Sequence, residues 1–190
     1  MSEAERSHLP ESELPAWQRV WRYWLATPDF YARHMAWMDG FAPSALQRVT
    51  LIDQPWSAAF ISWLMREAGL NRAQFEFSAS HHDYVRAAMA ASDAENQGQD
   101  SAYGWRACNL AQTPPRVGDL LCFARGGDAG LDTFDPLRQA ISQGPVSMHC
   151  ELVVSHQGRR IATVGGNVLD TVTLRQLDLA QDGSDLLWPA

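Results

Sequence analysis

The hydrophobic period of the chain changes near residue 115, and this change limits the folds that the sequence can adopt. Before that point apolar residues recur at helical spacing, and the first such stripe consists of Trp17, Val20, Trp21, Trp24 and Leu25. After it, short apolar runs are separated by glycine-containing turns, which is typical of strands. Helices first and strands second predict an α+β domain in which helices pack on an antiparallel sheet.

The segment at residues 56–69 is apolar around most of its circumference and ends in a glycine, as expected of a buried central helix. Pro55 is well suited to begin this helix, because proline is tolerated in the first helical turn. We expect the side chains of Phe60, Trp63 and Leu64 to be nearly fully buried. Further helices are predicted at residues 17–25, 30–38 and 82–95.

Strands are predicted at residues 119–124, 149–154, 161–164 and 168–174. The expected turns between the last three strands are Gln157-Gly158 and Gly165-Gly166. The connection at residues 125–147 is rich in Gly and Asp, with one short helix expected near residues 136–141. A connection of that length inside a compact domain often carries function.

The length of 190 residues fits one domain, with residues 1–15 as a loose arm, 16–54 as a helical extension and 55–190 as the α+β domain. The formal net charge of −7 argues against nucleic acid as a partner, because phosphates would find little positive charge. No apolar run approaches the roughly 20 residues that cross a bilayer, so no integral membrane segment is expected. The sequence leaves the oligomeric state open.

The first residues are polar and acidic, and they lack the basic start and apolar middle of a signal peptide. The expected location is therefore the periplasm or the exterior if the chain begins after a removed signal, and the cytoplasm otherwise. Three cysteines, Cys108, Cys122 and Cys150, allow at most one bridge and argue against a disulfide framework. We expect Cys122 and Cys150 to be small buried hydrophobes of apolar strands. No Cys or His spacing matches a zinc site, so no metal or cofactor is expected.

Four short motifs follow one another within residues 50–175. They are Trp56-Ser57-Ala58-Ala59-Phe60-Ile61-Ser62-Trp63, Pro115-Arg116-Val117-Gly118-Asp119-Leu120-Leu121, His149-Cys150-Glu151-Leu152-Val153 and Gly165-Gly166-Asn167-Val168-Leu169-Asp170-Thr171-Val172. In this order they resemble four parts of the papain-like amidases and endopeptidases of bacterial cell walls, the NlpC-type and CHAP superfamily. Those parts are the nucleophile helix, the entry to the first core strand, the strand of the catalytic His and the strand of the third polar residue.

More narrowly, the whole pattern is similar to an uncharacterised bacterial family within this group, domain of unknown function 2272. The resemblance implies a papain-like domain, with a central N-terminal helix packed on an antiparallel sheet and extra helices before it. It also implies a hydrolase of amide bonds in peptidoglycan stem peptides, with Ser57, His149 and Asn167 as its catalytic residues.

The chemistry of these three residues fits the resemblance. A nucleophile in the first turn of a helix meets unpaired backbone N–H groups and the positive end of the helix dipole, which stabilise an anion. His149 would act as base toward Ser57 and then as acid toward the leaving amine, while Asn167 would hold the imidazole tautomer. Glu151 is a rival for that orienting role, because it lies two residues from His149 on the same strand face.

Ser57 stands where the superfamily typically has a cysteine, and a hydroxyl is a poorer nucleophile than a thiol. Three explanations compete: a true Ser-His hydrolase on a papain-like fold, an inactive relative that only binds, or a Cys→Ser change introduced to trap an inactive state. Base rates also favour a helix cap for Ser57 and a turn role for Asn167.

Other residues have both a functional and a structural interpretation. Trp56 and Asp119 are possible supporting residues of the site, although Asp119 could simply begin a strand and bond nearby backbone. His81 and Tyr84 are candidates for the wall of the substrate cleft. A helix cap explains His81 equally well, and an exposed helix face explains Tyr84.

The sequence therefore leaves two functions from different classes open. One is peptidoglycan hydrolysis by a Ser-His-Asn site, and the other is non-catalytic binding of a cell-wall peptide or a protein partner in the same cleft. A hydroxyl within about 3.5 Å of an imidazole nitrogen, under an open groove, favours the enzyme. A cleft plugged by residues 125–147 favours the binding module.

Overall fold

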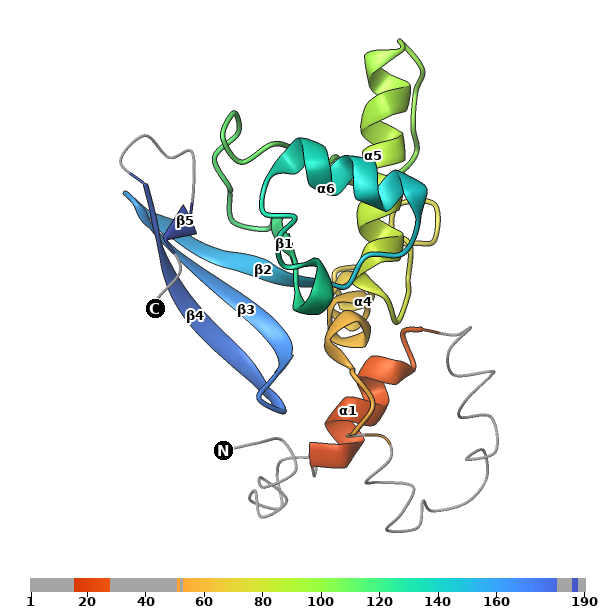
Figure 1. Cartoon of the computed structure of the whole chain (residues 1–190). Helices are drawn as coiled ribbons and strands as arrows, with labels where there is room; N and C mark the ends of the chain where they lie inside the picture. The colour runs from red at the N-terminus through yellow and green to blue at the C-terminus, as the bar shows by residue number, and fades with distance from the viewer. Residues whose placement is uncertain (1–15, 28–50, 52, 181–185, 188–190) are drawn as a thin grey trace.

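The computed structural model of the chain describes residues 16–27, 51, 53–180, 186 and 187, so the predicted arm at 1–15 and helix at 30–38 lie outside the described residues. The elements in chain order are α1 (Ala16–Trp24), α4 (Ser57–Glu67), α5 (His81–Asn96), β1 (Leu120–Ala124), a short 3₁₀ helix (Gly126–Asp128), α6 (Phe134–Gln143), β2 (Met148–Gln157), β3 (Arg160–Val168), β4 (Thr171–Leu179) and β5 (Leu186–Leu187). Helices α1, α4 and α5 precede an antiparallel sheet, and α6 lies between its first two strands, which confirms the predicted α+β class (Figure 1). No helix in these described ranges is long and apolar enough to cross a membrane.

The strands form one antiparallel meander in the order β1-β2-β3-β4-β5. The register of β1 and β2 places Phe123 opposite His149 and Cys122 opposite Cys150. Helix α4 packs against β2 and β3 of the sheet and against α1. The start of β2 and the end of β3 are therefore the parts of the sheet that face the start of α4 (Figure 1).

The predicted turn at Gly165-Gly166 is wrong, because both glycines lie inside β3. The chain turns later, through Leu169 and Asp170, both of which have positive φ. The glycines are needed for space: a Cβ at Gly166 would lie 2.6 Å from the Cβ of Phe60, and one at Gly165 would lie 3.0 Å from Nε2 of His149. Glycine at these two positions thus lets α4 and β2 approach β3 closely.

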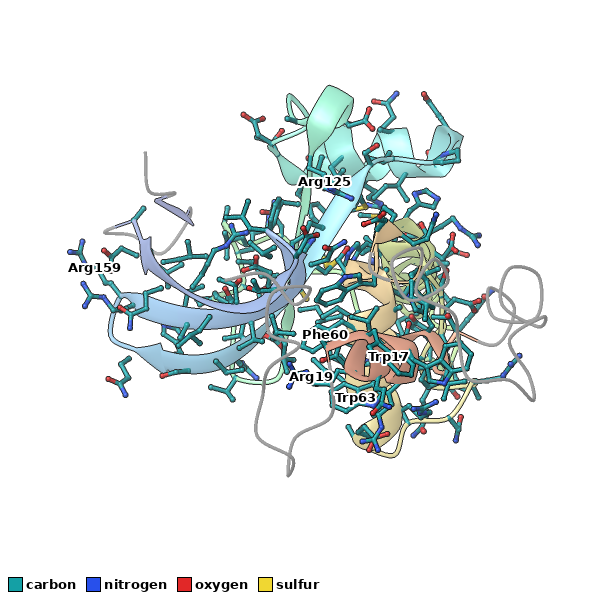
Figure 2. All side chains as sticks on the ribbon, turned by 90° about the horizontal axis from the view of Figure 1, so that it is seen from below. Trp17, Arg19, Phe60, Trp63, Arg125 and Arg159 are labelled. Carbon is teal, nitrogen blue, oxygen red and sulfur yellow. A yellow bond between two sulfur atoms is a disulfide. The ribbon has the colours of Figure 1, made fainter. Side chains whose placement is uncertain are left out.

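The core is centred on the first half of α4. Phe60 is buried as predicted, but Trp63 and Leu64 are only partly buried, so the expectation for those two residues is wrong. Tyr23 of α1 covers this face, with its ring centroid 5.2 Å from that of Phe60 and 5.1 Å from that of Trp63. Phe60 and Trp63 are labelled beside the ribbon of α1 in Figure 2. The apolar pattern overstated the burial of Trp63 and Leu64 because the sheet and α1 leave part of this helix open.

Cys122 and Cys150 form a disulfide, which corrects the prediction that they are small buried hydrophobes. They lie directly opposite each other in the paired strands, with Cα atoms 4.1 Å apart and a sequence separation of 28. The sequence pattern locates each strand but does not fix the register that brings the two sulfur atoms together. The disulfide joins β1 to β2 beside His149, and Cys108 is free and exposed.

Candidate functional site

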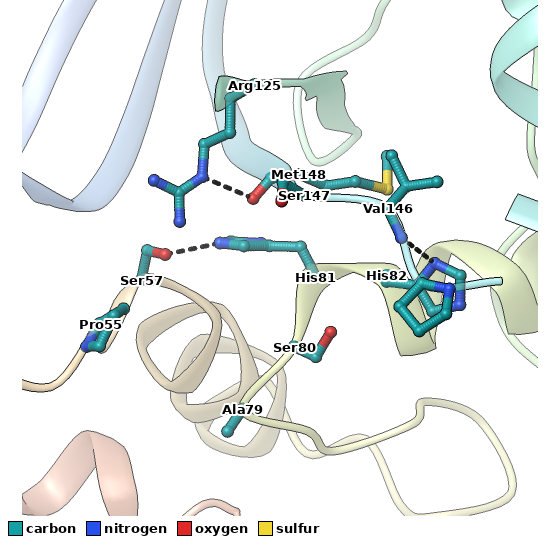
Figure 3. Close-up of a pocket in the computed structure, with 11 residues that line it drawn as sticks. Pro55, Ser57, Ala79, Ser80, His81, His82, Arg125, Val146, Ser147 and Met148 are labelled. Carbon is teal, nitrogen blue, oxygen red and sulfur yellow. Dashed lines mark hydrogen bonds between the residues drawn. The ribbon is translucent and has the colours of Figure 1, made fainter. Parts of the chain in front are cut away.

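The starts of α4 and α5 meet at a hydrogen bond between Ser57 and His81. Ser57 is the first residue of α4, so the helix begins two residues later than predicted for Pro55. Its Oγ lies 2.7 Å from Nε2 of His81, the first residue of α5 (Figure 3). The two residues are only 5% and 4% exposed. The pair therefore combines a hydroxyl at a helix N-terminus with an imidazole that is largely shielded from water.

The second ring nitrogen of His81 faces a phenol. Its Nδ1 is hydrogen-bonded to the hydroxyl of Tyr84, one turn further along α5. Burial, followed by the electrostatic influence of His149 and Arg125, holds the pKa of His81 well below 6.5. Burial also raises the pKa of Tyr84 well above 10, so the phenol keeps its proton at neutral pH. A neutral His81 can thus accept from Ser57 at Nε2 while its Nδ1–H donates to Tyr84.

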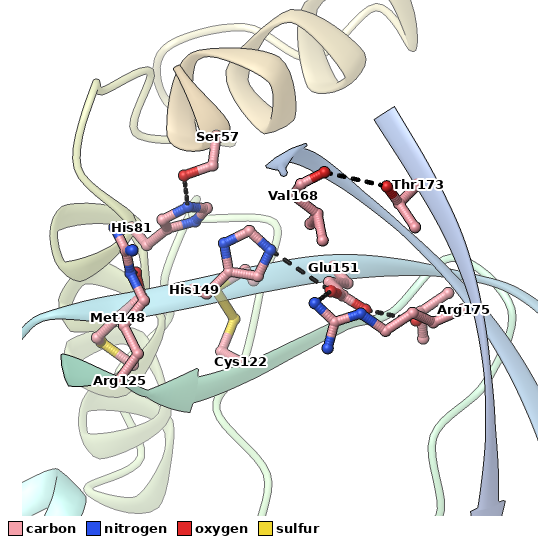
Figure 4. A network of polar contacts seen from close by, with 12 residues as sticks. Ser57, His81, Cys122, Arg125, Met148, His149, Glu151, Val168, Thr173 and Arg175 are labelled. Carbon is pink, nitrogen blue, oxygen red and sulfur yellow. Dashed lines mark hydrogen bonds and ion pairs between the residues drawn. A yellow bond between two sulfur atoms is a disulfide. The ribbon is translucent and has the colours of Figure 1, made fainter. Parts of the chain in front are cut away.

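His149, which the sequence predicts as the base for Ser57, lies beside His81. The centroids of the two imidazole rings are 5.1 Å apart. Nε2 of His149 is 3.5 Å from Oε1 of Glu151, the residue predicted as a rival orienter (Figure 4). Ser57 is thus hydrogen-bonded to one imidazole, that of His81, and a second imidazole with a carboxylate beside it lies next to His81.

Glu151 is a fully buried carboxylate held by three neighbours. Besides His149, it receives a hydrogen bond from Thr163 Oγ1 at 2.6 Å, and Nη2 of Arg175 lies 3.0 Å from its Oε1. Burial alone would raise the pKa of Glu151, but the contacts with His149 and Thr163 and the charge of Arg175 together lower it below 4.5. The carboxylate is therefore ionised at neutral pH and supplies a fixed negative charge behind His149.

Asn167 lies at the end of β3 and contacts the backbone where α4 begins. With its amide oriented to satisfy both neighbours, its oxygen accepts from the backbone N–H of Trp56 at 3.2 Å and its nitrogen donates to Asp170 Oδ1 at 3.1 Å. Asn167 also has a positive φ of 56°. In this arrangement it ties the β3–β4 turn to the entry of α4, a position from which it fixes the location of Ser57.

The two supporting candidates, Trp56 and Asp119, have structural contacts of their own. Trp56 is fully buried and its ring centroid is 5.5 Å from that of Tyr23, so it anchors the entry of α4 in the core. Asp119 accepts a hydrogen bond from the backbone N–H of Arg116 at 2.7 Å, and this bond closes the turn before β1.

A pocket of about 280 Å³ opens over Ser57 and His81 (Figure 3). Its wall is built from the entries of α4 and α5 on one side and from the ends of the β1–β2 connection on the other. The lining residues are Pro55, Ser57, Ala79, Ser80, His81, His82, Arg125, Pro145, Val146, Ser147 and Met148. The connection at residues 125–147 therefore contributes to the wall through its two ends.

The pairing of Ser57 with His81 was not predicted by the sequence. The sequence predicts His81 as part of the cleft wall or as a helix cap, because the resemblance assigns the role of base to His149. The available signal was local: a helix beginning at residue 81 or 82 puts Tyr84 one turn beyond His81, where a hydroxyl can reach the ring. The described residues contain no group of three or more His, Cys, Asp and Glu side chains that could hold a metal ion.

Residues 11–187 match a family described as "Uncharacterized protein conserved in bacteria (DUF2272)". No curated protein and no solved structure matches the chain. The match spans most of the 190 residues and includes Ser57, His81, His149 and Asn167. The chain therefore belongs to the uncharacterised bacterial family DUF2272.

Proposed function

We propose that this protein is a hydrolase of amide bonds in which Ser57 is the nucleophile. The observation that carries the proposal is the 2.7 Å hydrogen bond between Ser57 Oγ and His81 Nε2, made at the start of a helix and under a pocket. A hydroxyl becomes an effective nucleophile when an adjacent base can take its proton.

His81 is the base that the proposal assigns. Oγ of Ser57 attacks the substrate carbonyl carbon as Nε2 of His81 takes the hydroxyl proton, and the protonated ring then gives that proton to the leaving amine. Water hydrolyses the resulting acyl-enzyme in a second step, with His81 again as base. Tyr84 holds the ring by accepting from Nδ1–H, which keeps Nε2 directed at Ser57.

Helix α4 supplies the stabilisation of the developing oxyanion. The first backbone N–H groups of a helix have no acceptor within the helix. In α4 the N–H of Phe60 donates to the carbonyl of Trp56 at 2.9 Å. Donors held in place before the reaction can stabilise the tetrahedral intermediate without reorganising. Asn167 keeps these donors in place through its bond to the N–H of Trp56.

The proposed substrate is the stem peptide of peptidoglycan, and the proposed fold family is the papain-like NlpC and CHAP group. The order of the four motifs supports both, together with a nucleophile helix that packs against the strands of His149 and Asn167. The disulfide between Cys122 and Cys150 fits an oxidising compartment such as the periplasm, where such a substrate occurs.

The experiment is to incubate the purified protein with peptidoglycan fragments and to follow the products by mass. The expected result is release of new amine and carboxyl termini by the wild type and none by Ser57→Ala. Ser57→Cys restores the nucleophile type that is typical of the superfamily and provides the second variant. If neither the wild type nor Ser57→Cys releases any product, amide hydrolysis of this substrate is excluded.

A second candidate function is binding without catalysis, and one observation favours it. The partner of His81 Nδ1 is the neutral phenol of Tyr84, which offers no negative charge to stabilise a protonated ring. For a binding module, Ser57→Ala should leave the affinity for peptidoglycan fragments nearly unchanged, and no product should appear at any protein concentration.

A further inference from the structure

The pocket over Ser57 has one cationic side chain and no carboxylate in its lining. Arg125, which follows β1, supplies the positive charge, and none of the other lining residues is Asp or Glu. The formal net charge of the whole chain is −7. The local charge of the pocket is therefore opposite to that of the protein, which favours an anionic ligand.

Arg125 is held in place by backbone rather than by an acid. Its Nε donates to the carbonyl of Met148 at 3.1 Å, and its own backbone N–H donates to the carbonyl of Ser147 at 2.9 Å. Among the residues that the structure describes, no Asp or Glu forms an ion pair with Arg125. Its two terminal nitrogens lie over the hydrogen bond of Ser57 and His81 (Figure 3).

This geometry has a chemical consequence. Anchoring through Nε fixes the plane of the guanidinium and leaves the terminal N–H groups for a ligand. A planar guanidinium binds a carboxylate in bidentate fashion, which adds geometric specificity to charge. An acid bound there would lie beside the carbonyl that Ser57 attacks.

We infer that Arg125 forms a carboxylate subsite, so that the substrate carries a free carboxylate next to the amide bond to be cleaved. The inference rests on the proposed hydrolase function and narrows its substrate class to acidic acyl amides. Arg125 is a binding residue here, and it takes no part in proton transfer.

The test is a binding titration that does not require turnover. Succinate is titrated into the full chain while the ring signals of His81 are followed by NMR, and neutral succinamide serves as the matched probe. We expect saturable binding of succinate and none of succinamide. Arg125→Gln should weaken succinate binding by about tenfold or more, because it removes charge-assisted hydrogen bonds. Arg159→Gln, in the turn between β2 and β3, removes the same charge away from the pocket and should have no effect (Figure 2).

Three results would overturn the subsite: equal binding of succinate and succinamide, unchanged succinate affinity in Arg125→Gln, or no binding to the wild type. Inorganic phosphate is titrated as a third probe. Phosphate binding that is much tighter than succinate binding would overturn the carboxylate subsite in favour of a site for a phosphate ester. Succinate binding that depends on Arg125, in a protein that hydrolyses no amide, would leave the subsite intact and refute the proposed function.

Discussion

Phe60 of α4 and Gly166 of β3 are packed so closely that no side chain fits between them. A Cβ built on Gly166 would lie 2.6 Å from the Cβ of Phe60 and 2.7 Å from its Cγ. Both the helix that carries Ser57 and the strand that carries Asn167 are positioned by this contact. The distance between the two elements thus depends on the absence of a single methyl group.

Replacing Gly166 by alanine should therefore destabilise the protein. We expect Gly166→Ala to lower the free energy of unfolding by about 1–3 kcal/mol, because the added methyl overpacks a buried contact. Urea denaturation measures the change. Gly127→Ala is the matched control, since nothing lies within 4 Å of a Cβ at that position. An equal effect of the two substitutions would show that the helix and the strand are not in close contact.

The disulfide between Cys122 and Cys150 should contribute measurably to stability. Since it closes a loop across 28 residues of sequence, its reduction should lower the free energy of unfolding by about 2–4 kcal/mol. The comparison is between denaturation with and without reductant. A Cys108→Ser variant should respond to reductant as the wild type does, and a variant with Cys122→Ala and Cys150→Ala should not respond. A wild type insensitive to reductant would argue that the two cysteines are unpaired.

Acid should remove the stabilisation that comes from Glu151. Its pKa is lower in the folded protein than its ordinary value of 4.5, so the unfolded chain binds this proton more readily. The contribution is fully present above pH 4.5 and is lost as the pH falls through the lower folded value. Glu151→Gln should therefore show a smaller loss of stability on acidification than the wild type. The control Glu67→Gln removes an exposed carboxylate. If the stability of Glu151→Gln falls as steeply with acidification as that of Glu67→Gln, the assignment to Glu151 is contradicted.

The pH dependence of activity should test whether His81 is the base. The pKa of His81 lies well below 6.5, so its Nε2 can accept the proton of Ser57 even in mildly acidic solution. We expect kcat/KM to stay level from about pH 8 downward and to decline only below pH 6.5. An acid limb at or above pH 6.5 would contradict His81 as the base.

The elements of the fold were predictable from the sequence because hydrophobic period is a local property. The switch near residue 115 predicted the strands and the apolar run after Trp56 predicted α4. Contacts that depend on register were not predictable. The pairing of Cys122 with Cys150 depends on how β1 and β2 align, and the strand position of Gly165 depends on its space against His149.

The same limit applies to the site. The motif order predicted that Ser57 lies at the start of a helix and that His149 is its base. The structure places His149 beside His81. The hydrogen bond to His81 depends on the relative position of two helix starts that are 24 residues apart in sequence. Hydrophobic periodicity does not predict the distance between two helix starts, and the resemblance gave His81 no catalytic role.

The central claim is that His81 activates Ser57, and covalent labelling with a fluorophosphonate tests it without knowledge of the substrate. Mass spectrometry of the digested protein should locate one adduct, on Ser57, and Ser57→Ala should show none. His81→Gln should slow labelling by about a hundredfold or more, because the hydroxyl loses its base. His156→Gln, which replaces a histidine bonded to Pro115 O and Gly158 O, should label at the wild-type rate. Absence of a Ser57 adduct, or undiminished labelling in His81→Gln, would contradict the account.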